Sequence, residues 1–448
     1  MTILLASTYE LGRQPFGLAS PAAWLEREGH QVICADLAIE PLTDERIRAA
    51  DAAAFFLPMH TATRLAIPAI KRAKKVNPSL RLACYGLYAW MNADLLRGLG
   101  VEAILGGEFE SGLVRFARGE APQGVFLDRQ AFVTPQRSGL PDLRHYAKLS
   151  FNGSKKLVGY TEASRGCKHL CRHCPVVPVY QGQFRIVQRE AVMTDIRQQA
   201  QAGAAHITFG DPDFFNGPKH AIEIVRAMHS EFPGLTYDVT IKIEHLLKLR
   251  GWLPTLKETG CLFVTSAVES VDDEILAKLE KNHTRRDVIE AATLMRKAGL
   301  HFAPTFIPFT PWTTVSGYRD LLSVIADLEL IGHVAPVQLA LRLLVTAGSR
   351  LLELGEMRGV LGDFDPGALV YPWKHPDAEV DRLAEDAFRL VSEEQEKGRT
   401  REEIFGGLWR RAYGSEPPVS GRAHIQVPYL DEPWYCCAEP APSRGAVV

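Results

Sequence analysis

Three cysteines lie close together in the segment SRGCKHLCRHCP, residues 164–175. Cys167, Cys171 and Cys174 are separated by three residues and then by two. A disulfide uses two thiols and a closed zinc site uses four ligands, so an odd group suits neither. Three thiolates can hold three irons of a four-iron cluster and leave the fourth open to a substrate or cofactor. The spacing therefore favours a [4Fe-4S] cluster with one open position.

Positively charged side chains surround these cysteines. Arg165 precedes them, and Lys168, Arg172 and His173 lie among them. Positive charge favours the thiolate and stabilises an anionic cluster. Two alternatives stay open, a zinc site completed by a histidine and a purely structural loop. In the sequence no second Cys-x-x-Cys or histidine pair follows at zinc spacing, which argues against the first alternative.

The composition is that of a soluble globular chain. It has 448 residues, of which 46% are hydrophobic and 23% charged, and its net charge is −2. This length predicts two or three domains, and the near neutrality gives no global attraction to nucleic acid or to an anionic membrane. The start, MTILLASTYELG, does not resemble a signal peptide, and no apolar stretch is long enough to span a membrane. We therefore expect a cytoplasmic protein without nucleic-acid or membrane partners.

Strand-like and helix-like patterns alternate twice along the chain. The first alternation predicts a Rossmann-like, doubly wound domain over residues 1–120, followed by a Pro- and Gly-rich linker over 121–154. The second predicts a partial (βα)6 barrel over 155–348, because it has fewer units than the eight of a closed TIM barrel. A helical C-terminal region with an irregular tail follows over 349–448. The expected fold class is α/β, and the expected barrel strands lie at 155–164, 206–214, 236–242, 261–270, 301–309 and 336–345.

The cysteine spacing, its place after a strand and the partial barrel together resemble the radical S-adenosylmethionine (radical SAM) superfamily. The resemblance covers roughly residues 155–345. It implies that the open iron binds the amino and carboxylate groups of SAM. An electron from the cluster then breaks a carbon–sulfur bond and releases a carbon radical. The implied partners are a small-molecule substrate and an electron donor such as flavodoxin or ferredoxin.

Polar residues near the ends of the expected strands match SAM-binding positions of that superfamily. Gly210 and Asp211 stand at the glycine-rich strand end, so the resemblance assigns Asp211 to the methionine amino group. Ser266 and Glu269 on the fourth strand and Thr305 on the fifth are expected to face SAM.

Two further segments carry polar residues. Gln338 and Arg342 on the sixth strand are expected to face inward, because a polar residue on an apolar barrel strand is costly without a partner. Lys281, His283 and Thr284 resemble the superfamily's Lys-Gly-x-Thr stretch and are expected to cap the next helix.

The N-terminal domain resembles the cobalamin-binding domain of one radical SAM class. ILGGEFES, residues 104–111, matches the Gly-Glu-x-Glu sequence of that class. Two departures argue against bound cobalamin. No Asp-x-His-x-x-Gly sequence supplies an axial histidine, and Tyr88 and Trp90 stand where the cobalamin tail would pass. His60 could approach a cobalt, although an ordinary loop histidine is the favoured interpretation. Cobalamin binding is left open.

The tail WYCCAEP, residues 434–440, resembles the ending of the radical SAM family named for its CUAEP or CCAEP tail, in which U is selenocysteine. Selenocysteine implies a reactive position, so Cys436 and Cys437 are candidate catalytic residues. Adjacent cysteines rarely pair with each other, and a soft thiolate pair suits a soft acceptor such as trivalent arsenic. The tail more distantly resembles the radical SAM enzyme of arsinothricin biosynthesis. A packed tail with incidental thiols is the alternative.

These patterns predict a transferase-type radical SAM enzyme that transfers or generates a carbon radical on a small substrate. The leading version is methyl or alkyl transfer, with or without cobalamin. The alternative is transfer of the 3-amino-3-carboxypropyl group of SAM to arsenite bound by the tail thiols. A rival from another class is an iron–sulfur redox or metalloid sensor without SAM chemistry. The polar strand ends argue against the sensor, because a sensor needs no such pocket.

Overall fold

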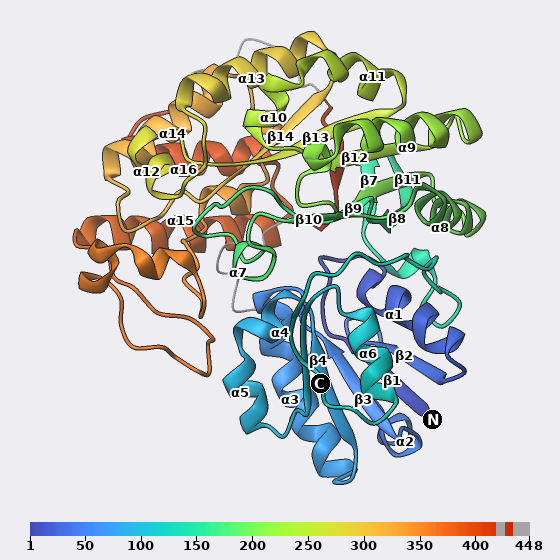
Figure 1. Ribbon diagram of the computed structural model, residues 1–448. Coiled ribbons are helices and arrows are strands. Elements are labelled where there is room, and N and C mark those ends of the chain that lie inside the picture. Colours follow the sequence, from blue (N-terminus) through green and yellow to red (C-terminus); the bar gives the residue numbers. More distant parts are fainter. Residues whose placement is uncertain (418–425, 433–448) are drawn as a thin grey trace.

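The computed structural model describes residues 1–417 and 426–432. Figure 1 shows two α/β bodies, an N-terminal sheet with its helices in blue and a larger curved sheet with its helices in green and yellow. The last two helices, α15 and α16, lie in orange and red on the flank of the second body. The predicted class, a Rossmann-like sheet followed by a partial barrel and a helical extension, is confirmed.

Six parallel strands form the N-terminal sheet in the order β2-β1-β3-β4-β5-β6. The strand order reverses between β1 and β3, and the carboxyl ends of strands at such a point form a ligand crevice. The strands are β1 (Thr2–Ser7), β2 (Gln31–Asp36), β3 (Ala52–Phe56), β4 (Arg81–Tyr85), β5 (Ala103–Gly107) and β6 (Gln123–Phe126). The helices are α1 (Phe16–Arg27), α2 (Asp44–Ala49), α3 (His60–Val76), α4 (Leu87–Met91), α5 (Ala93–Gly98) and α6 (Glu110–Ala117).

Helices cover both faces of this sheet because side chains alternate along each strand. On β1, Ile3 and Leu5 belong to the core that contains apolar residues of α1 and α6. Leu4 and Ala6 belong to the core on the other face, which contains apolar residues of α3. The near-continuous apolar runs seen in the sequence are therefore those of a sheet buried on both faces.

Five parallel strands form the second sheet, which two antiparallel strands extend in the order β14-β13-β12-β11-β8-β7-β15. The strands are β7 (Lys148–Phe151), β8 (Ser154–Thr161), β11 (His206–Phe209), β12 (Thr236–Thr240), β13 (Cys261–Glu269), β14 (His301–Phe306) and β15 (Tyr429–Leu430). The helices outside it are α8 (Arg189–Gln201), α9 (Pro218–Glu231), α10 (Ile243–Lys248), α11 (Leu253–Glu258), α12 (Asp273–Lys278), α13 (Arg285–Lys297) and α14 (Val315–Asp327).

The sixth barrel strand, predicted over 336–345, is not a strand. Residues Pro336–Leu339 form a 3-10 turn, and Arg342 forms an isolated parallel bridge with Phe309. Pro336 has no N–H to give to a ladder, and the chain leaves the sheet soon after the bridge.

The segment predicted as a linker, 121–154, contains two strands. β6 adds a sixth strand to the N-terminal sheet, and β7 forms a hairpin with β8. Both strands have four residues. Strands this short give little alternation, so the sequence pattern does not reveal them.

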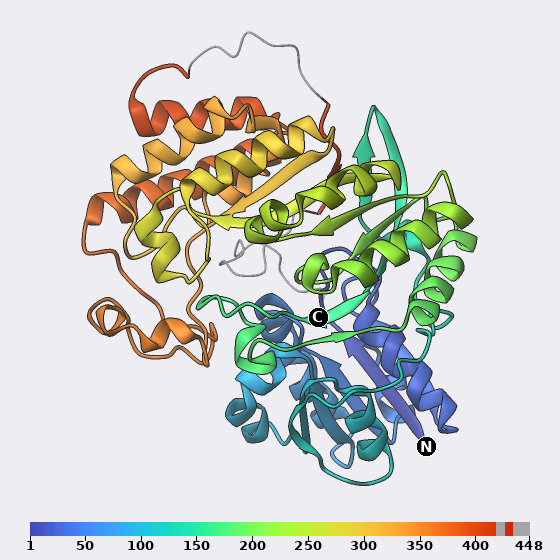
Figure 2. The ribbon, with the colours of Figure 1, turned by 45° about the horizontal axis from the view of Figure 1, so that its top comes forward.

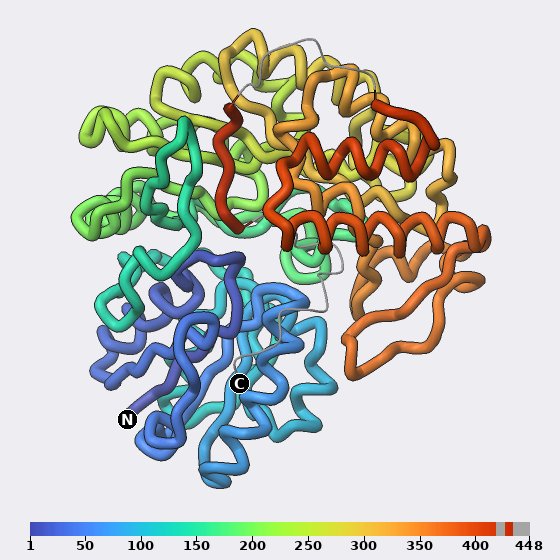
Figure 3. The backbone as a smooth tube through the Cα atoms, turned by 180° about the vertical axis from the view of Figure 1, so that it is seen from behind, coloured from blue at the N-terminus to red at the C-terminus, as the bar shows by residue number. Residues whose placement is uncertain are grey.

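The end of the described chain closes the free edge of the second sheet. Tyr429 pairs with Ser150 and Leu430 with Leu149, antiparallel. Figure 3 shows this red segment running beside the teal hairpin of β7 and β8. Asp431 then accepts hydrogen bonds from Ser150 Oγ at 2.8 Å and Lys155 Nζ at 3.0 Å. The pairing covers an exposed edge and brings Glu432 against the inside of the barrel.

The C-terminal helices α15 (Ala378–Glu396) and α16 (Arg401–Tyr413) share the main core of the barrel. Val380 and Ala387 of α15 and Ile404 and Leu408 of α16 are buried in it. Residues 350–377, predicted as part of a helical region, contain two 3-10 turns, Arg350–Glu353 and Gly355–Gly359. Within the described residues, no helix is both long and apolar enough to cross a membrane.

Candidate active site

A cavity of about 1300 Å³ lies between the two sheets. The carboxyl ends of β11, β12 and β13 supply one wall, and the loops after β1, β3 and β4 supply the other. These loops follow the strands at which the order of the N-terminal sheet reverses. In Figure 2 the loop that carries the cysteines and α7 (Val177–Tyr180) lies between the two bodies. Both sheets therefore present their ligand-binding ends to one space.

The three clustered cysteines line this cavity together. None of Cys167, Cys171 and Cys174 is in a disulfide. The loop begins at Gly166, where φ is +75° and an added Cβ would lie 2.3 Å from the Tyr180 ring. Only glycine suits that position, because the conformation and the space both exclude a side chain. The donor set fits three irons of a four-iron cluster, as the sequence predicts.

The barrel adds positive charge near the cysteines. Lys242, buried after β12, has its Nζ 3.5 Å from Cys171 Sγ. Arg172 turns away and pairs with Glu280 at 2.6 Å. Burial raises the pKa of the Cys167 thiol to about 12. Near neutral pH this thiol therefore ionises only when a metal cation binds it. Sequence reasoning missed Lys242, which is distant from the cysteines along the chain.

A buried His–Asp–His group adjoins the first cysteine. The ligand atoms of Cys167, His169 and Asp213 lie within 4.8 Å of one another. Asp213 Oδ2 also lies 2.6 Å from Nδ1 of His245. These donors could bind a zinc ion, but a zinc site formed by them would leave Cys171 and Cys174 without a role. The convergence of three thiols on one cavity favours the cluster.

Asp211 and Gly210 lie where the sequence places them, in the cavity wall beyond β11. Asp211 accepts hydrogen bonds from Ser164 Oγ at 2.5 Å and from the backbone N–H of Ala163 at 2.9 Å. Burial raises the pKa of Asp211 to about 7. A Cβ on Gly210 would lie 1.8 Å from the Tyr160 hydroxyl, so a side chain there would displace the tyrosine.

Glu269 also lines the cavity, at the end of β13. Its Oε1 accepts hydrogen bonds from Lys281 Nζ and His173 Nε2, each at 3.2 Å. Burial alone would raise the pKa of Glu269, but Lys281 and His173 outweigh burial and hold that pKa at about 2. The prediction that Lys281 and His283 cap the next helix is wrong, because His283 bonds instead to the carbonyl of Val268. The cap is Thr284.

Three other predicted residues lie outside this cavity. Ser266 is buried between Val264 and Val268 of the helix-covered core, whereas the cavity is lined by Ala267. Alternation places residues 265 and 267 on one face and Ser266 on the other. Arg342 pairs with Asp381 at 2.9 Å and stacks on Trp373 at 4.0 Å, so it joins the barrel to α15. Thr305 lines a second chamber, deeper in the barrel, together with Gln338.

The N-terminal wall of the cavity is largely apolar. Leu11, Phe56, Pro58, Met59 and Leu87 line it, together with the charged residues Glu10 and Arg13. His60 is held elsewhere, because its Nε2 lies 2.7 Å from the carbonyl of Ala368. Burial lowers the pKa of His60 to about 4.

Trp90 and Tyr88 fill space at the ends of β4 and β5. The Trp90 Cβ lies 3.1 Å from the position of a Cβ on Gly106, and the Tyr88 ring lies edge-on to the His60 ring at 6.4 Å. The described residues of the N-terminal wall thus offer a largely apolar surface that contains no histidine, so they would supply no histidine ligand to a corrinoid bound there.

One buried arginine joins the two bodies. Arg165, just before the cysteine loop, pairs with Glu110 at 2.6 Å, Glu162 at 2.7 Å and Glu108 at 3.3 Å. Glu108 and Glu110 belong to the GGEFES segment after β5. Burial raises the pKa of Glu108 to about 7 even though Arg165 lowers it. Sequence reasoning noted both segments but not that they pair.

The catalytic candidates Cys436 and Cys437 lie outside the described residues.

Comparison with known proteins agrees with this geometry. Residues 161–317, which include the cysteine loop and the strands around the cavity, match the Radical SAM superfamily. Hopanoid C-3 methylase of Methylococcus capsulatus is 27% identical over 325 residues, which cover 67% of this chain and 62% of that protein. A threonylcarbamoyladenosine tRNA methylthiotransferase of Rickettsia prowazekii is 22% identical over 60% of this chain and 64% of its own. The chain thus spans less than two thirds of these curated relatives.

Solved structures share the whole architecture. The radical SAM methyltransferase TsrM of Kitasatospora setae, solved with tryptophan and a SAM analogue, has a TM-score of 0.70 at 14% identity and covers 87% of this chain and 89% of its own. The cobalamin-dependent radical SAM enzyme OxsB has a TM-score of 0.67 at 14% identity and covers 88% of this chain and 67% of its own. At such identities these matches establish the fold.

Residues 161–317 belong to the Radical SAM superfamily, in agreement with the three cysteines that line the cavity. The chain as a whole has the fold of solved radical SAM enzymes, among them the cobalamin-dependent OxsB.

Proposed function

We propose that this chain transfers a methyl or other alkyl group from SAM to a small substrate held between the two sheets. The observation that carries the proposal is that three thiols, an acidic group and a lysine face one cavity at the carboxyl ends of the barrel strands. A [4Fe-4S] cluster with SAM on its open iron supplies reductive cleavage of a carbon–sulfur bond. Methyl transfer is supported by the names of the relatives, a methylase and methylthiotransferases.

The residues around the cavity have separate roles in this proposal. Asp211 binds the ammonium group of SAM, since an ionised carboxylate held by Ser164 and a backbone N–H has a fixed orientation. Lys242 supplies positive charge to the cysteine loop. Glu269, tied to Lys281 and His173, keeps the end of β13 in place. The apolar N-terminal wall excludes water from the radical or holds the flat face of a corrinoid.

Cys436 and Cys437 remain proposed participants in the reaction. Support comes from their place in the sequence, four and five residues after Glu432, which lines a second chamber next to the cavity. Transfer of an aminocarboxypropyl group to arsenite rests on these two thiols alone, and we do not propose it, because the relatives are named for methyl and methylthio transfer.

The test is anaerobic incubation of reconstituted protein with SAM and a strong reductant, with products identified by mass spectrometry. Formation of 5′-deoxyadenosine or S-adenosylhomocysteine, lost in Cys171→Ala and retained in Cys261→Ala, supports the proposal. Cys261 is a buried cysteine at the start of β13 and makes the matched control. Methylthioadenosine formed only with arsenite and lost on Cys436→Ala would replace it with aminocarboxypropyl transfer. A cluster-loaded protein that yields no SAM-derived product would leave the sensor as the better description.

A further inference from the structure

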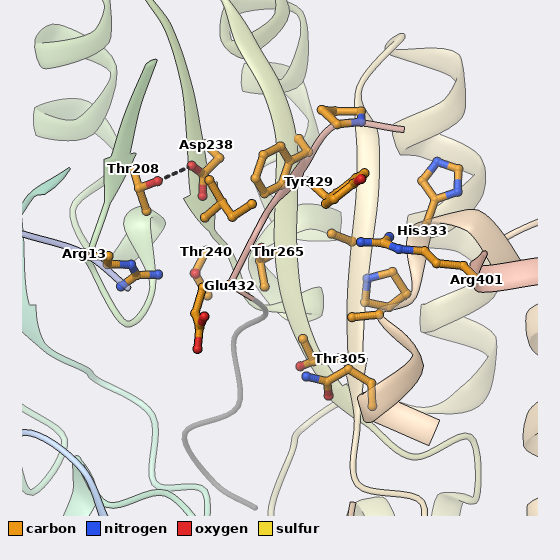
Figure 4. A pocket seen from close by; sticks show the side chains of 17 residues that line it. Arg13, Thr208, Asp238, Thr240, Thr265, Thr305, His333, Arg401, Tyr429 and Glu432 are labelled. Carbon is orange, nitrogen blue, oxygen red and sulfur yellow. Dashed lines mark hydrogen bonds between the residues drawn. The ribbon is translucent and has the colours of Figure 1, made fainter. Parts of the chain in front are cut away.

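A second chamber, of about 690 Å³, lies inside the barrel next to the cysteine-lined cavity (Figure 4). Arg13 and Thr240 line both spaces, so the chamber and the cavity adjoin. β15 and Glu432 complete the wall at the sheet edge. Figure 4 shows the labelled polar side chains of the barrel strands and of Arg13 and Glu432 around one space.

The lining is polar where a barrel interior is ordinarily apolar. The interior positions of such barrels are dominated by branched hydrophobic residues, but here neighbouring strands present Thr208, Asp238, Thr240, Thr265 and Thr305. The pairs 238 and 240 on β12 and 263 and 265 on β13 are two residues apart, which puts both members of each pair on the inner face. Buried hydroxyl and carboxylate groups are costly without partners. An inner face of this kind indicates a polar ligand.

Thr305 gives the clearest evidence that the chamber can bind a polar ligand. It is 7% exposed, and its hydroxyl has no hydrogen-bond partner among the described residues. Gln338 lies in the same wall and uses its Oε1 to accept a hydrogen bond from the backbone N–H of Phe306. The Thr305 hydroxyl is therefore available to a molecule in the chamber.

Asp238 uses one of its two carboxylate oxygens for contacts within the protein. Oδ1 accepts a hydrogen bond from Thr208 Oγ1 at 2.6 Å and lies 2.9 Å from His206 Nε2. His206 is fixed in turn by Thr236 Oγ1, 2.9 Å from its Nδ1. Both contacts use Oδ1, so Oδ2 can accept a hydrogen bond from a ligand. A carboxylate positioned in this way suits a protonated amine.

Arg13 supplies the opposite charge at the mouth of the chamber. Its guanidinium lies over the Tyr160 ring at 4.7 Å, and its buried Nε has no hydrogen-bond partner among the described residues. Glu432, in the same wall, accepts a hydrogen bond from the Tyr9 hydroxyl at 2.6 Å. A guanidinium with an unpartnered donor suits a carboxylate.

We propose that the chamber binds the substrate, and that the substrate is a small amino-acid-like molecule carrying both an ammonium and a carboxylate group. Asp238 binds the ammonium, Arg13 binds the carboxylate at the side that faces the cysteine-lined cavity, and Thr305 binds a polar atom elsewhere in the molecule. This inference rests on the proposed function and gives its substrate class.

The test uses the anaerobically reconstituted full chain with SAM present. Pools of the twenty L-amino acids are screened by saturation-transfer NMR, and each hit is measured by calorimetry beside its decarboxylated amine and its deaminated hydroxy acid. We expect at least one amino acid to bind, and its amine and hydroxy acid to bind at least tenfold more weakly. Asp238→Asn and Arg13→Gln should each weaken binding at least tenfold. The matched surface variants Glu385→Gln and Arg358→Gln, both at exposed positions, should not.

Thr305→Val is a second variant that should fold normally. The hydroxyl that it removes has no hydrogen-bond partner among the described residues, and valine has the same shape as threonine. The substitution should weaken binding severalfold while leaving the cluster absorbance and SAM affinity unchanged. The inference is overturned by an amine or hydroxy acid that binds as well as the amino acid, by hits that Asp238→Asn does not affect, or by no hit at millimolar concentration. Cleavage of SAM in the same preparation separates the two ideas. A protein that cleaves SAM but binds no amino acid refutes only the substrate class, and one that does not cleave SAM refutes the proposed function.

Discussion

At the scale of single residues, the cavity wall contains buried carboxyl groups whose pKa values depend strongly on their neighbours. Asp211 has a raised pKa because it is buried, whereas Glu269 has a lowered pKa because Lys281 and His173 outweigh burial. Two carboxyl groups in one cavity wall therefore differ in charge near neutral pH. Glu269 is always ionised there, while Asp211 changes its charge in the range where enzymes work.

The pKa of Asp211 predicts pH-dependent SAM binding. Below about pH 7 the free enzyme holds this carboxyl protonated, so it must lose a proton before it can bind an ammonium group. We expect the Kd for SAM to fall up to about tenfold between pH 6 and pH 8. In Asp211→Asn the affinity should be lower and the dependence flat. A pH dependence that survives the substitution would assign the titration to another group; equilibrium dialysis at constant ionic strength measures both.

Lys242 predicts a shift in the redox behaviour of the cluster. Its ammonium lies 3.5 Å from Cys171 Sγ, and removing a positive charge makes reduction of an anionic cluster harder. In Lys242→Met the reduction potential should fall by tens of millivolts, on the order of 1 kcal/mol or more, as measured by a redox titration followed by EPR. Lys248→Met, at the end of α10, should leave the potential unchanged. An equal potential in both variants would remove Lys242 from the electrostatics of the cluster.

At the scale of elements, helix caps and strand edges are set by local sequence. Thr284 caps α13 with a reciprocal hydrogen-bond pair to Asp287, and Thr400 caps α16 in the same way with Glu403. Each pair satisfies backbone N–H groups that would otherwise lack partners. The predicted cap is confirmed for Thr284, because a capping box depends only on two residues three positions apart.

The cap of α13 predicts a modest loss of stability. Thr284→Ala should lower the free energy of unfolding by about 1 kcal/mol, seen as a lower midpoint in urea with an unchanged slope. Thr293→Ala in the middle of the same helix should cause no loss, because its hydroxyl bonds only to the Ile289 carbonyl and alanine favours a helix. Equal losses in the two variants would contradict a role for the capping box.

At the scale of the whole molecule, Arg165 joins the N-terminal sheet to the barrel beside the cysteine loop. Its three carboxylate partners come from both bodies, and the pairs with Glu108 and Glu110 are buried on both sides. Removing one partner of a buried ion pair leaves charges without compensation. The same residue that precedes the cluster loop thus fixes where that loop lies relative to the N-terminal wall.

Arg165→Met predicts a large and pH-dependent loss. The free energy of unfolding should fall by about 3–5 kcal/mol. The pKa of Glu108 is already raised above its ordinary value of 4.5 to about 7, and removing the guanidinium raises it further. A folded-state pKa above the unfolded value means that stability falls as pH rises from about 4.5, so the loss should be smaller at pH 6 than at pH 8.5.

The control is Arg172→Met, whose partly exposed pair with Glu280 is worth at most about 1 kcal/mol. A loss in Arg165→Met that is equally small, or that does not vary with pH, would show that this network does not hold the two bodies together. Denaturant unfolding followed by fluorescence gives the values for both variants.

The sequence by itself determined the features that depend on short spacings. The cysteine loop, the alternation of strands and helices, Asp211 after its strand and the Thr284 cap all follow from residues a few positions apart, because periodicity, turns and caps are local. Only the tertiary structure decided which distant groups meet. Lys242 approaches Cys171 across 71 positions of chain, Arg165 reaches the GGEFES segment, and Asp238 and Thr305 face one chamber. Ser266 and Arg342 lie outside the cavity although their residue types suit a binding site. Strand alternation turns Ser266 to the opposite face of β13, and Arg342 lies where the chain leaves the sheet and pairs with Asp381.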